Sequence, residues 1–284
     1  MKTPTALQKV FSRLWRQPGF RRLFYNGLGL AFRGRRDWQM MNCGYLAPQS
    51  APASIPLPPE WKAEHLSYAL YAHLVRETPL AGKEILELGA GRGGGARYVH
   101  RMYTPRRVVA ADYAAQTTRW CRRNFSAPGL DFITADACAL PFPDSAFDVL
   151  IGVEVTHCLP DKARFFAEAA RVLRPGGRLL IADFFYRRPD AMHALGKFEA
   201  ALAAAPFTIE IDEDLTPGVM AAMETDSVRR IADITRSVPK PLQNVARSFA
   251  STTESGTYLG LANGRAVYRR YVLTRTKARA GVAP

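Results

Sequence analysis

Several features are scarce or missing in this chain of 284 residues, and each absence excludes a class of protein. No uninterrupted apolar stretch approaches the ~20 residues of a membrane-spanning helix, and the first residues lack the apolar core of a signal peptide. The four cysteines form no C-x-x-C pair, which argues against a zinc knuckle or a disulfide framework. They are Cys43, Cys121, Cys138 and Cys158. We therefore expect a cytoplasmic protein with reduced thiols.

Acidic residues are also missing from the first part of the chain. Nine lysines and arginines precede the first acid, Asp37, and the net charge of the whole chain is +14. Nucleic acid, an anionic membrane surface and an acidic substrate are all compatible with this charge. The alternative is a chain that is basic throughout and needs no anionic partner.

Residues 4–40 have a helical pattern of apolar side chains. The stripe consists of Leu7, Val10, Phe11, Leu14 and Trp15, and basic residues lie off it. A basic amphipathic helix with a tryptophan can lie in a membrane interface. The same pattern fits a helix that packs on its own domain, so a peripheral membrane contact is one of two hypotheses.

The most informative stretch runs from Glu84 to Gly95 and reads E-I-L-E-L-G-A-G-R-G-G-G. A short apolar run over residues 85–88 predicts a buried strand, five glycines follow, and a helical pattern begins after them. Glycines at such a bend let a ligand approach bare backbone N–H groups. The glycine pattern alone also fits a nicotinamide or flavin site, or a tight turn. Glu87 favours a cationic ligand, because its carboxylate would repel a pyrophosphate.

With this acid-x-G-x-G-x-G motif, the chain resembles the class I S-adenosylmethionine-dependent methyltransferases over residues 81–185. The resemblance implies S-adenosylmethionine as the cofactor, with Glu87, Gly89, Ala90 and Gly91 at its site. It also implies a Rossmann-like, doubly wound α/β sheet of seven strands with the last strand antiparallel, N-terminal helices and a helical lid. The alternation of predicted strands and helices separately indicates a parallel sheet with right-handed crossovers.

Two further predicted strands end in acids. Residues 108–111 lead into Asp112, about twenty residues past the glycines, where a doubly wound sheet places a carboxylate against ribose hydroxyls. Asp112 could instead cap the following helix, and Tyr113 is a candidate for an adenine contact. Residues 130–135 lead into Asp136 and Ala137. The resemblance places this pair at the adenine, where a carboxylate can accept a hydrogen bond from the amino group.

The fourth predicted strand, residues 147–153, leads into the segment E-V-T-H-C at residues 154–158. The resemblance places Glu154 at the cofactor site and the reacting group nearby. Methyl transfer from a sulfonium is an in-line displacement, and an alcohol or carboxyl acceptor must also lose a proton. His157 is therefore our candidate for the base. The alternative is a histidine that only shapes the pocket wall.

Ahead of the core, residues 41–45 read M-N-C-G-Y. A similar segment occurs in bacterial methyltransferases that act on fatty-acyl, polyketide and glycolipid hydroxyls or carboxyls. By that resemblance Tyr45 closes over the cofactor. An ordinary turn with a packed tyrosine is the alternative.

The remaining patterns complete the predicted fold. We expect a helix over 60–77, a helix over 165–173 ended by an L-R-P-G-G turn, a fifth strand over 179–184, a helix over 191–204, a strand over 207–211, a helix with Thr216 as N-cap, and a last strand over 266–274. Four regions follow: an N-terminal helical extension with the cofactor-capping segment (1–78), the S-adenosylmethionine-binding core (79–188), a helical lid with the sixth strand (189–265), and the last strand with the tail (266–284).

The favoured hypothesis is an S-adenosylmethionine-dependent methyltransferase with a small, largely apolar acceptor of natural-product or lipid-like type. Oxygen is the preferred acceptor atom, with carbon and nitrogen left open. The alternatives are a non-methylating accessory protein or cyclase of polyketide biosynthesis, and an RNA methyltransferase. The sequence V-E-V-T at 153–156 differs from the (D/N)-P-P-(F/Y) of enzymes that methylate base amines, which argues against nucleic acid. No recognisable spacing of Asp183 with Asp161 or Glu154 predicts a metal, and nothing predicts an oligomeric state.

Overall fold

The computed structural model describes residues 38–48, 57–240 and 243–276, together with a few isolated positions between 14 and 34. The helix expected over residues 4–40 and the proline-rich link at 49–56 therefore lie almost entirely outside the described residues. Within the described part, no helix is both long and apolar enough to cross a membrane.

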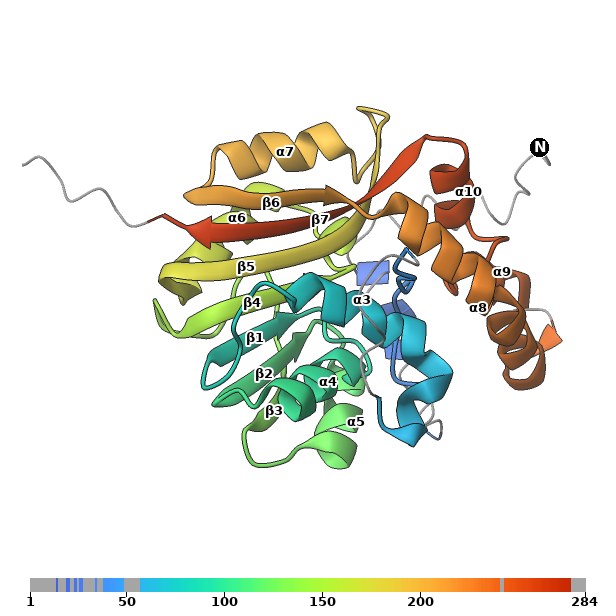
Figure 1. Cartoon of the computed structure of the whole chain (residues 1–284), viewed down its shortest axis with the longest axis horizontal. Coiled ribbons are helices and arrows are strands. Elements are labelled where there is room, and N and C mark those ends of the chain that lie inside the picture. Colours follow the sequence, from blue (N-terminus) through green and yellow to red (C-terminus); the bar gives the residue numbers. More distant parts are fainter. Residues whose placement is uncertain are drawn as a thin grey trace, which may run out of the picture.

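One seven-stranded sheet forms the centre of the molecule (Figure 1), in the order β3-β2-β1-β4-β5-β7-β6. The strands are β1 (Glu84–Leu88), β2 (Arg107–Asp112), β3 (Leu130–Thr134), β4 (Phe147–Val153), β5 (Leu173–Tyr186), β6 (Phe207–Asp214) and β7 (Ala266–Arg275). β1 to β5 pair in parallel, whereas β7 is antiparallel to both β5 and β6. The predicted doubly wound, seven-stranded Rossmann-like fold with an antiparallel last strand is confirmed.

Helices cover both faces of this sheet. They are the 3₁₀ helices η1 (Pro59–Glu64) and η2 (Thr156–Cys158), and the α-helices α3 (His65–Val75), α4 (Gly94–Tyr103), α5 (Ala115–Phe125), α6 (Lys162–Val172), α7 (Leu195–Ala203), α8 (Thr216–Ser237), α9 (Gln243–Phe249) and α10 (Gly256–Ala262). In Figure 1, α3 and α4 lie in front of the sheet, and α8 and α9 extend beyond one end of it. Two apolar clusters fill the layers, one with side chains from α3 and α4 and the other with side chains from α6 and α7.

The alternation of side chains along β1 positions the site. Ile85 belongs to the cluster with α3 and α4, whereas Leu86 and Leu88 belong to the opposite cluster. Because side chains two residues apart share a face, Glu87 points with Ile85 toward α3 and α4. A central parallel strand is covered on both faces, so this carboxylate is buried, with 2% of its surface exposed.

Several predicted boundaries were wrong. The L-R-P-G-G segment is not a turn ahead of the strand, because α6 ends at Val172 and β5 begins at Leu173, with a register shift opposite Phe147 and Val149. The helix expected over 191–204 begins only at Leu195, and the one expected over 60–77 is divided between η1 and α3.

Thr216 is not the N-cap of its helix. Leu215 holds that position and Thr216 is the first helical residue. The Thr216 hydroxyl instead accepts a hydrogen bond from the backbone N–H of Tyr268 at 2.9 Å. Asp214 accepts from Thr216 N at 2.8 Å, so an acid outside the helix satisfies this backbone donor.

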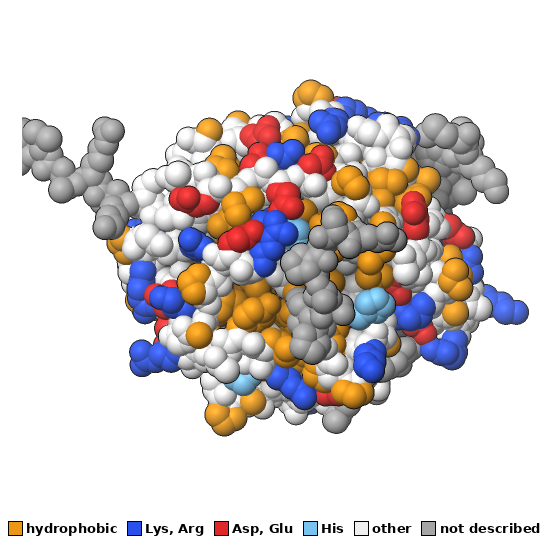
Figure 2. Space-filling model, viewed as in Figure 1, with side chains coloured by type: hydrophobic (Ala, Val, Ile, Leu, Met, Phe, Trp, Pro, Cys, Tyr) orange, Lys and Arg blue, Asp and Glu red, His pale blue; other side chains and the backbone are white. Residues whose placement is uncertain are grey.

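Charged side chains are mixed on the visible face of the molecule. Figure 2 shows lysines and arginines interleaved with aspartates and glutamates rather than gathered into one basic patch. All four cysteines are free in the structure, and Cys43, Cys121 and Cys138 are buried.

Candidate functional site

The carboxyl ends of β1 to β5 lie at one edge of the sheet, and the acids and the histidine predicted for the site lie within these strands or shortly after them. In open α/β sheets, ligands bind in the crevice outside these strand ends. In Figure 1 the same edge faces α8 and α9.

Glu87 presents a buried carboxylate that is only half satisfied. Its Oε1 accepts a hydrogen bond from the Tyr71 hydroxyl at 2.6 Å, and none of the described residues donates to Oε2. Burial raises the pKa of Glu87 to about 8, although hydrogen bonds from the Tyr71 hydroxyl and the Ala96 backbone N–H oppose the shift. A buried acid without a cationic partner favours its neutral form, and a bound cation would restore the charge. The site therefore fits a positively charged ligand group.

Asp112 holds the glycine loop, which we define as residues 89–95 between β1 and the first turn of α4. Its two carboxylate oxygens accept hydrogen bonds from the backbone N–H groups of Gly91 and Ala114, each at 2.8 Å. Gly89 and Gly91 have φ values of 69° and 50°, in the region that favours glycine. The structure thus brings Asp112 to the glycine loop, a contact that the sequence did not indicate, and α5 has no side-chain cap. Contact of Asp112 with a ribose stays a prediction.

Two glycines of the motif allow close approach by other segments. A Cβ on Gly95 would lie 2.2 Å from the Tyr71 ring and 2.3 Å from Glu87 Oε1. A Cβ on Gly94 would lie 2.3 Å from the Met40 sulfur and 2.8 Å from the Gln39 carbonyl oxygen. The bare backbone therefore admits contacts with other segments of the protein here, which the sequence did not indicate.

Residues 38–48, which we call the capping segment, lie against the glycine loop. Glu64 accepts hydrogen bonds from the backbone N–H groups of Gln39 and Met40, each at 3.1 Å. Burial raises the pKa of Glu64 to about 7. The guanidinium of Arg92 donates to the Trp38 carbonyl at 2.7 Å and lies 4.2 Å from the Trp120 ring centroid. Arg92, the one charged residue among the glycines, therefore anchors the segment.

Tyr45 lies at the other end of the capping segment. Its ring centroid is 4.2 Å from that of His73, and a Cβ on Gly218 would come within 2.3 Å of the ring. The residues near the glycine loop are Met40 and Met41 instead. Closure of Tyr45 over the cofactor stays a prediction.

The predicted adenine contacts lie on exposed turns after β2 and β3. Tyr113 is 43% exposed, and Asp136 accepts a hydrogen bond from the backbone N–H of Cys138 at 2.8 Å. Ala137, between Asp136 and Cys138 in the sequence, is half-buried. These side chains are available to a ligand at the strand ends, and their roles stay predictions.

Glu154 joins the capping segment to the core. Its Oε1 accepts from the Cys43 backbone N–H at 2.7 Å and from the Tyr268 hydroxyl at 2.9 Å. Its φ of 51° is uncommon for a residue with a side chain, and such strained positions cluster at functional sites. Burial raises the pKa of this carboxyl. The contacts show an anchoring role, and the predicted contact with the cofactor is untested.

His157 lies on η2, directly after β4, and its side chain is 17% exposed. Its Nδ1 is 3.1 Å from Oδ1 of Asp183, which is fully buried in β5. Burial disfavours the imidazolium, but electrostatic and hydrogen-bond interactions with the side chains of Cys158 and Asp183 outweigh it and raise the pKa of His157 well above its ordinary value. An imidazole held in this way can accept or release a proton at its other ring nitrogen.

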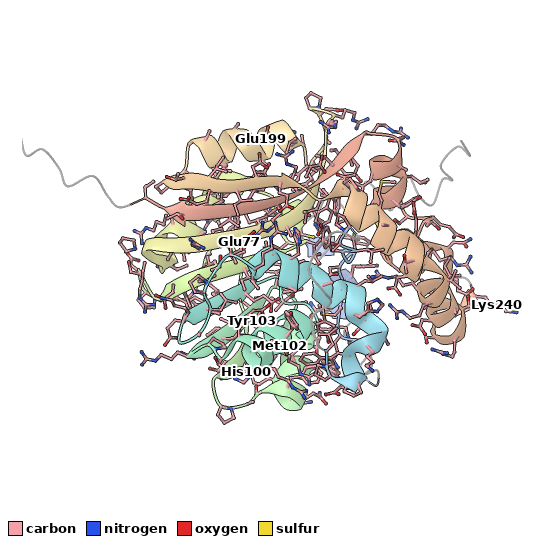
Figure 3. The ribbon with its side chains drawn as sticks, viewed as in Figure 1. Glu77, His100, Met102, Tyr103, Glu199 and Lys240 are labelled. Carbon is pink, nitrogen blue, oxygen red and sulfur yellow. The ribbon has the colours of Figure 1, made fainter. Side chains whose placement is uncertain are left out.

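The structure contains two hollows, of which one lies beside the capping segment and the other lies toward the opposite edge of the sheet. A cavity of about 160 Å³ lies between the capping segment and α8 and α9, with Met40, Met41, Glu64, Arg230, Ile234 and Ala250 among its lining residues. A more open hollow of about 600 Å³ includes Glu77, Met102 and Tyr103, which Figure 3 labels. It also includes Ala81 and Thr104, which precede β1 and β2, so it lies toward the opposite edge of the sheet.

Comparisons with known proteins agree with this geometry. A family profile described as "Methyltransferase domain" matches residues 86–181. A phthiotriol/phenolphthiotriol dimycocerosates methyltransferase of Mycobacterium tuberculosis is 31% identical over 90% of this chain and 93% of its own length. A fatty-acid O-methyltransferase of Mycolicibacterium smegmatis is 32% identical over 84% of each chain. The chain belongs to the S-adenosylmethionine-dependent methyltransferases.

Solved structures share the fold of this methyltransferase. The [4+2]-cyclase SpnF superposes with a TM-score of 0.68 at 18% identity, over 90% of this chain and 95% of its own. A sarcosine dimethylglycine methyltransferase from Galdieria sulphuraria has the same TM-score of 0.68 at 15% identity, over 89% and 98%. At such identities the likeness shows the fold alone.

Some residues at the site of the methyltransferase were not foreseen as functional. They are Tyr71, Arg92, Asp183 and Tyr268. Tyr71 lies in a helical stretch whose pattern indicates only packing, and Asp183 was considered only as a metal ligand. Among the described residues, no group of three histidine, cysteine, aspartate or glutamate side chains is placed to hold a metal ion. The only sequence signal for Asp183 is that it is an acid near the end of a predicted buried strand.

Proposed function

We propose that this methyltransferase transfers the methyl group to an oxygen atom of a small, largely apolar acceptor of lipid-like or natural-product type. The observation that carries the oxygen assignment is the partly exposed imidazole of His157 at the carboxyl end of β4. The names of the two mycobacterial relatives support the class of acceptor, since one refers to a fatty acid and the other to phthiotriol dimycocerosates.

The cofactor would be held by residues of three strand ends. Glu87, with Gly89, Ala90 and Gly91, would hold the aminoacyl end, because the free Oε2 of Glu87 suits an ammonium group. Asp112 and Tyr113 would face the ribose and adenine, and Asp136 with Ala137 the adenine amino group. When bound, S-adenosylmethionine supplies a sulfonium methyl, which passes to the acceptor oxygen as the carbon–sulfur bond breaks and S-adenosylhomocysteine is left.

His157 would take the proton that a hydroxyl acceptor loses. Nδ1 lies 3.1 Å from Asp183 and the Cys158 side chain also hydrogen-bonds the ring, so Nε2 would be the nitrogen that meets the acceptor once it is bound. The oxygen of the acceptor then gains the methyl group, and its proton moves to Nε2. General-base assistance of this kind contributes ~10²–10⁴-fold to a rate.

The acceptor would enter through the cavity between the capping segment and α8 and α9. Apolar side chains such as Ile234 and Met40 suit an acyl or ring system, and Arg230 and Glu64 suit its polar groups. The cavity of about 160 Å³ is smaller than the ~300–1,000 Å³ of usual ligand pockets. We therefore expect α8 or α9 to move outward when a long acceptor binds, as the predicted lid requires.

A product screen tests this function. The purified full-length chain is incubated with S-adenosylmethionine carrying a labelled methyl group and with lipid, phenolic and RNA pools, and products heavier by one methyl are identified by mass spectrometry. We expect a methyl ether or ester from the lipid or phenolic pool. Calorimetry with S-adenosylmethionine measures donor binding separately. Methylated RNA, a methylated carbon or nitrogen, or a cyclised product without methyl would contradict the proposal.

His157→Ala tests the base within the same assay. We expect turnover of a hydroxyl acceptor to fall by ~10²-fold or more while donor affinity changes little. Turnover near the wild-type value with the same acceptor would remove His157 from the mechanism.

A peripheral membrane contact and a cytoplasmic location complete the proposal. Both rest on the sequence: the membrane contact rests on the helix expected over 4–40, which lies almost entirely outside the described residues, and the location rests on the cysteines. Flotation with anionic phosphatidylglycerol vesicles at low salt is the test, and protein that stays at the bottom of the gradient speaks against membrane contact.

A further inference from the structure

We propose that Phe24 determines the length of the straight acyl chain that the methyltransferase accepts, and that Asn26 holds Phe24 in place by capping α5. The inference rests on the proposed entry of the acceptor through the cavity between the capping segment and α8 and α9, which we call the acceptor cavity. It stands on two contacts of a part of the chain that precedes the capping segment.

Phe24 brings an aromatic side chain to the acceptor cavity. It is half-buried and lines this cavity of about 160 Å³. The other large apolar residues of the lining are Trp38, Met40, Met41, Ile234 and Val238. An aromatic side chain is large for a space of this size, and packed protein interiors leave little room to spare. The size of the side chain at position 24 therefore changes the room that is left for an acceptor.

Asn26 ties this part of the chain to α5. Its Oδ1 accepts a hydrogen bond from the backbone N–H of Gln116 at 2.9 Å, across 90 residues of sequence. Gln116 lies in the first turn of α5, where the N-cap residue, Ala114, provides no side-chain hydrogen bond. Asparagine is among the side chains that best satisfy the N–H groups at the start of a helix. Asn26 thus caps α5 from a distant part of the chain.

The capped helix is fixed to the sheet. The hydroxyl oxygens of Thr118 in α5 and Thr134 in β3 lie 2.6 Å apart. Arg122 of α5 also donates to the Phe132 carbonyl of β3 at 3.0 Å. Because Phe24 is two residues from Asn26, its Cα lies at most about 7 Å from that of the anchored residue. Phe24 therefore belongs to a part of the cavity wall that is attached to the sheet.

Other parts of the wall are attached differently. Ile234 belongs to α8, which we expect to move outward when a long acceptor binds. The sulfurs of Met40 and Met41 lie within 3.6 Å of the Cβ positions of two glycines of the glycine loop, so these side chains also border the donor site. We therefore expect Phe24 to stay in place as the lid opens, and its size can be changed without altering the glycine loop.

A fixed ring in a narrow apolar cavity selects acceptors by length. One methylene group more or less in a hydrophobic pocket changes discrimination by ~10–200-fold. A methyl group in place of the ring leaves room for additional methylene groups, whereas an indole removes room. The two substitutions should therefore shift the preferred chain length in opposite directions.

Binding of fatty acids to the full chain tests this without turnover. The probes are octanoic, dodecanoic and hexadecanoic acids below the concentrations at which they form micelles. The protein is saturated with S-adenosylhomocysteine, which has no methyl group to transfer. Calorimetry gives the ratio of Kd for the shortest and the longest probe. We expect Phe24→Ala to shift this ratio by ~10-fold or more in favour of the longest probe, and Phe24→Trp to shift it in favour of the shortest.

Leu23→Ala is the matched control. Leu23 is 70% exposed and is not among the residues that line the acceptor cavity, so the ratio should stay at the wild-type value. The affinity of each variant for S-adenosylhomocysteine, measured by the same method, verifies that it is folded. If Phe24→Ala does not fold, Phe24→Leu takes its place. An unchanged ratio in the Phe24 variants, or an equal shift in Leu23→Ala, overturns the inference.

Asn26 is tested as the positioning residue in the same assay. Asn26→Ala should shift the ratio in the same direction as Phe24→Ala, because the ring loses its anchor. Asn26→Asp should keep the wild-type ratio, since a carboxylate also accepts hydrogen bonds at the start of a helix. In the Phe24→Ala background, Asn26→Ala should add no further shift. A further shift would show that Asn26 does not act through Phe24.

The outcomes separate this inference from the proposed function. If the product screen yields a methylated acceptor but the Phe24 variants keep the wild-type ratio, the function stands and the inference fails. If the ratio shifts as expected but no acceptor is methylated, Phe24 selects the chain and the proposed reaction is wrong. If no fatty acid binds the wild type, the cavity does not take straight acyl chains and the inference fails, while the product screen still decides the reaction.

Discussion

At the scale of single residues, the site of this methyltransferase depends on carboxylates that the fold buries. Glu87 shares its Oε1 with Tyr71 and keeps Oε2 free, and Asp112 uses both oxygens to hold backbone N–H groups. The two acids thus differ in what they offer a ligand. Glu87 favours its neutral form in the unliganded fold and would become charged when a cationic group binds.

Replacement of Glu87 by Gln is expected to stabilise the protein and to weaken donor binding. The pKa of about 8 in the folded state lies above the ordinary 4.5, so between these values the folded chain retains a proton that the unfolded chain has lost. The contribution of Glu87 to stability therefore falls as pH rises from about 4.5 to 8. Without ligand, Glu87→Gln should unfold at a temperature higher by ~2–4 °C or more at pH 8, with a smaller gap at pH 5.

Calorimetry should show that Glu87→Gln binds S-adenosylmethionine at least ~10-fold more weakly, which corresponds to ~1.4 kcal/mol. Thermal scans at pH 5 and pH 8 supply the stability half of the test. A variant that is less stable than wild type at pH 8, or that binds the donor equally well, would show that the carboxylate has a structural role instead.

At the scale of elements, the glycine loop serves as a joint between segments. Gly94 lets the capping segment approach α4, and Gly95 lets Tyr71 of α3 reach Glu87 of β1. The loop therefore holds three elements at contact distance. A side chain at either position would push them apart.

Gly95→Ala is expected to separate α3 from β1. Its Cβ would lie 2.2 Å from the Tyr71 ring, and overpacking of this kind costs ~1–3 kcal/mol of unfolding free energy. Urea denaturation measures that loss, and calorimetry should show weaker donor binding. Gly196→Ala, in α7, is the matched control: a Cβ there meets no atom within 4 Å, so stability should rise by up to ~1 kcal/mol. Equal effects of the two substitutions would contradict this account.

At the scale of the whole molecule, a fully buried arginine connects the helical layer to the edge of the sheet. Arg270 in β7 donates to the Leu74 carbonyl of α3 at 3.0 Å and to Glu213 of β6 at 2.9 Å, and it also pairs with Glu77. Its side chain has no exposed surface. The chain thereby links elements nearly 200 residues apart in sequence (a separation of 196 for Arg270 and Leu74).

Arg270→Ala is expected to cost ~1–3 kcal/mol of unfolding free energy, because the Leu74 carbonyl loses its buried donor while Glu213 keeps Arg76 as a partner. Urea denaturation measures the change. Arg269→Ala is the neighbouring control: it removes a partly exposed pair with Asp212 and should cost less than ~1 kcal/mol. If the two variants unfold at the same urea concentration, the buried network does not hold the layers together.

The sequence by itself determined the order of strands and helices, the parallel core and the glycine loop. Apolar periodicity reports burial, and the fourth strand was predicted with the bounds that the structure has, Phe147–Val153. The sequence also predicted that the acids at the strand ends lie along one edge of the sheet, because parallel strands bring their carboxyl ends to the same edge. The prediction that Thr216 is an N-cap was wrong. Asp214 accepts a hydrogen bond from the Thr216 backbone N–H, and the Thr216 hydroxyl accepts one from the Tyr268 backbone N–H.

Only the tertiary structure decided which groups meet at those strand ends. Glu154 binds Cys43 across 111 residues and Tyr268 across 114, and Asp183 meets His157 across 26. No local pattern encodes such pairs, because the packing of whole elements fixes the distance between their side chains. For the same reason no local pattern indicated that the Met40 and Met41 sulfurs lie beside Gly94 and Gly91. Local sequence sets which groups line the edge of the sheet, and packing sets which partner each one receives.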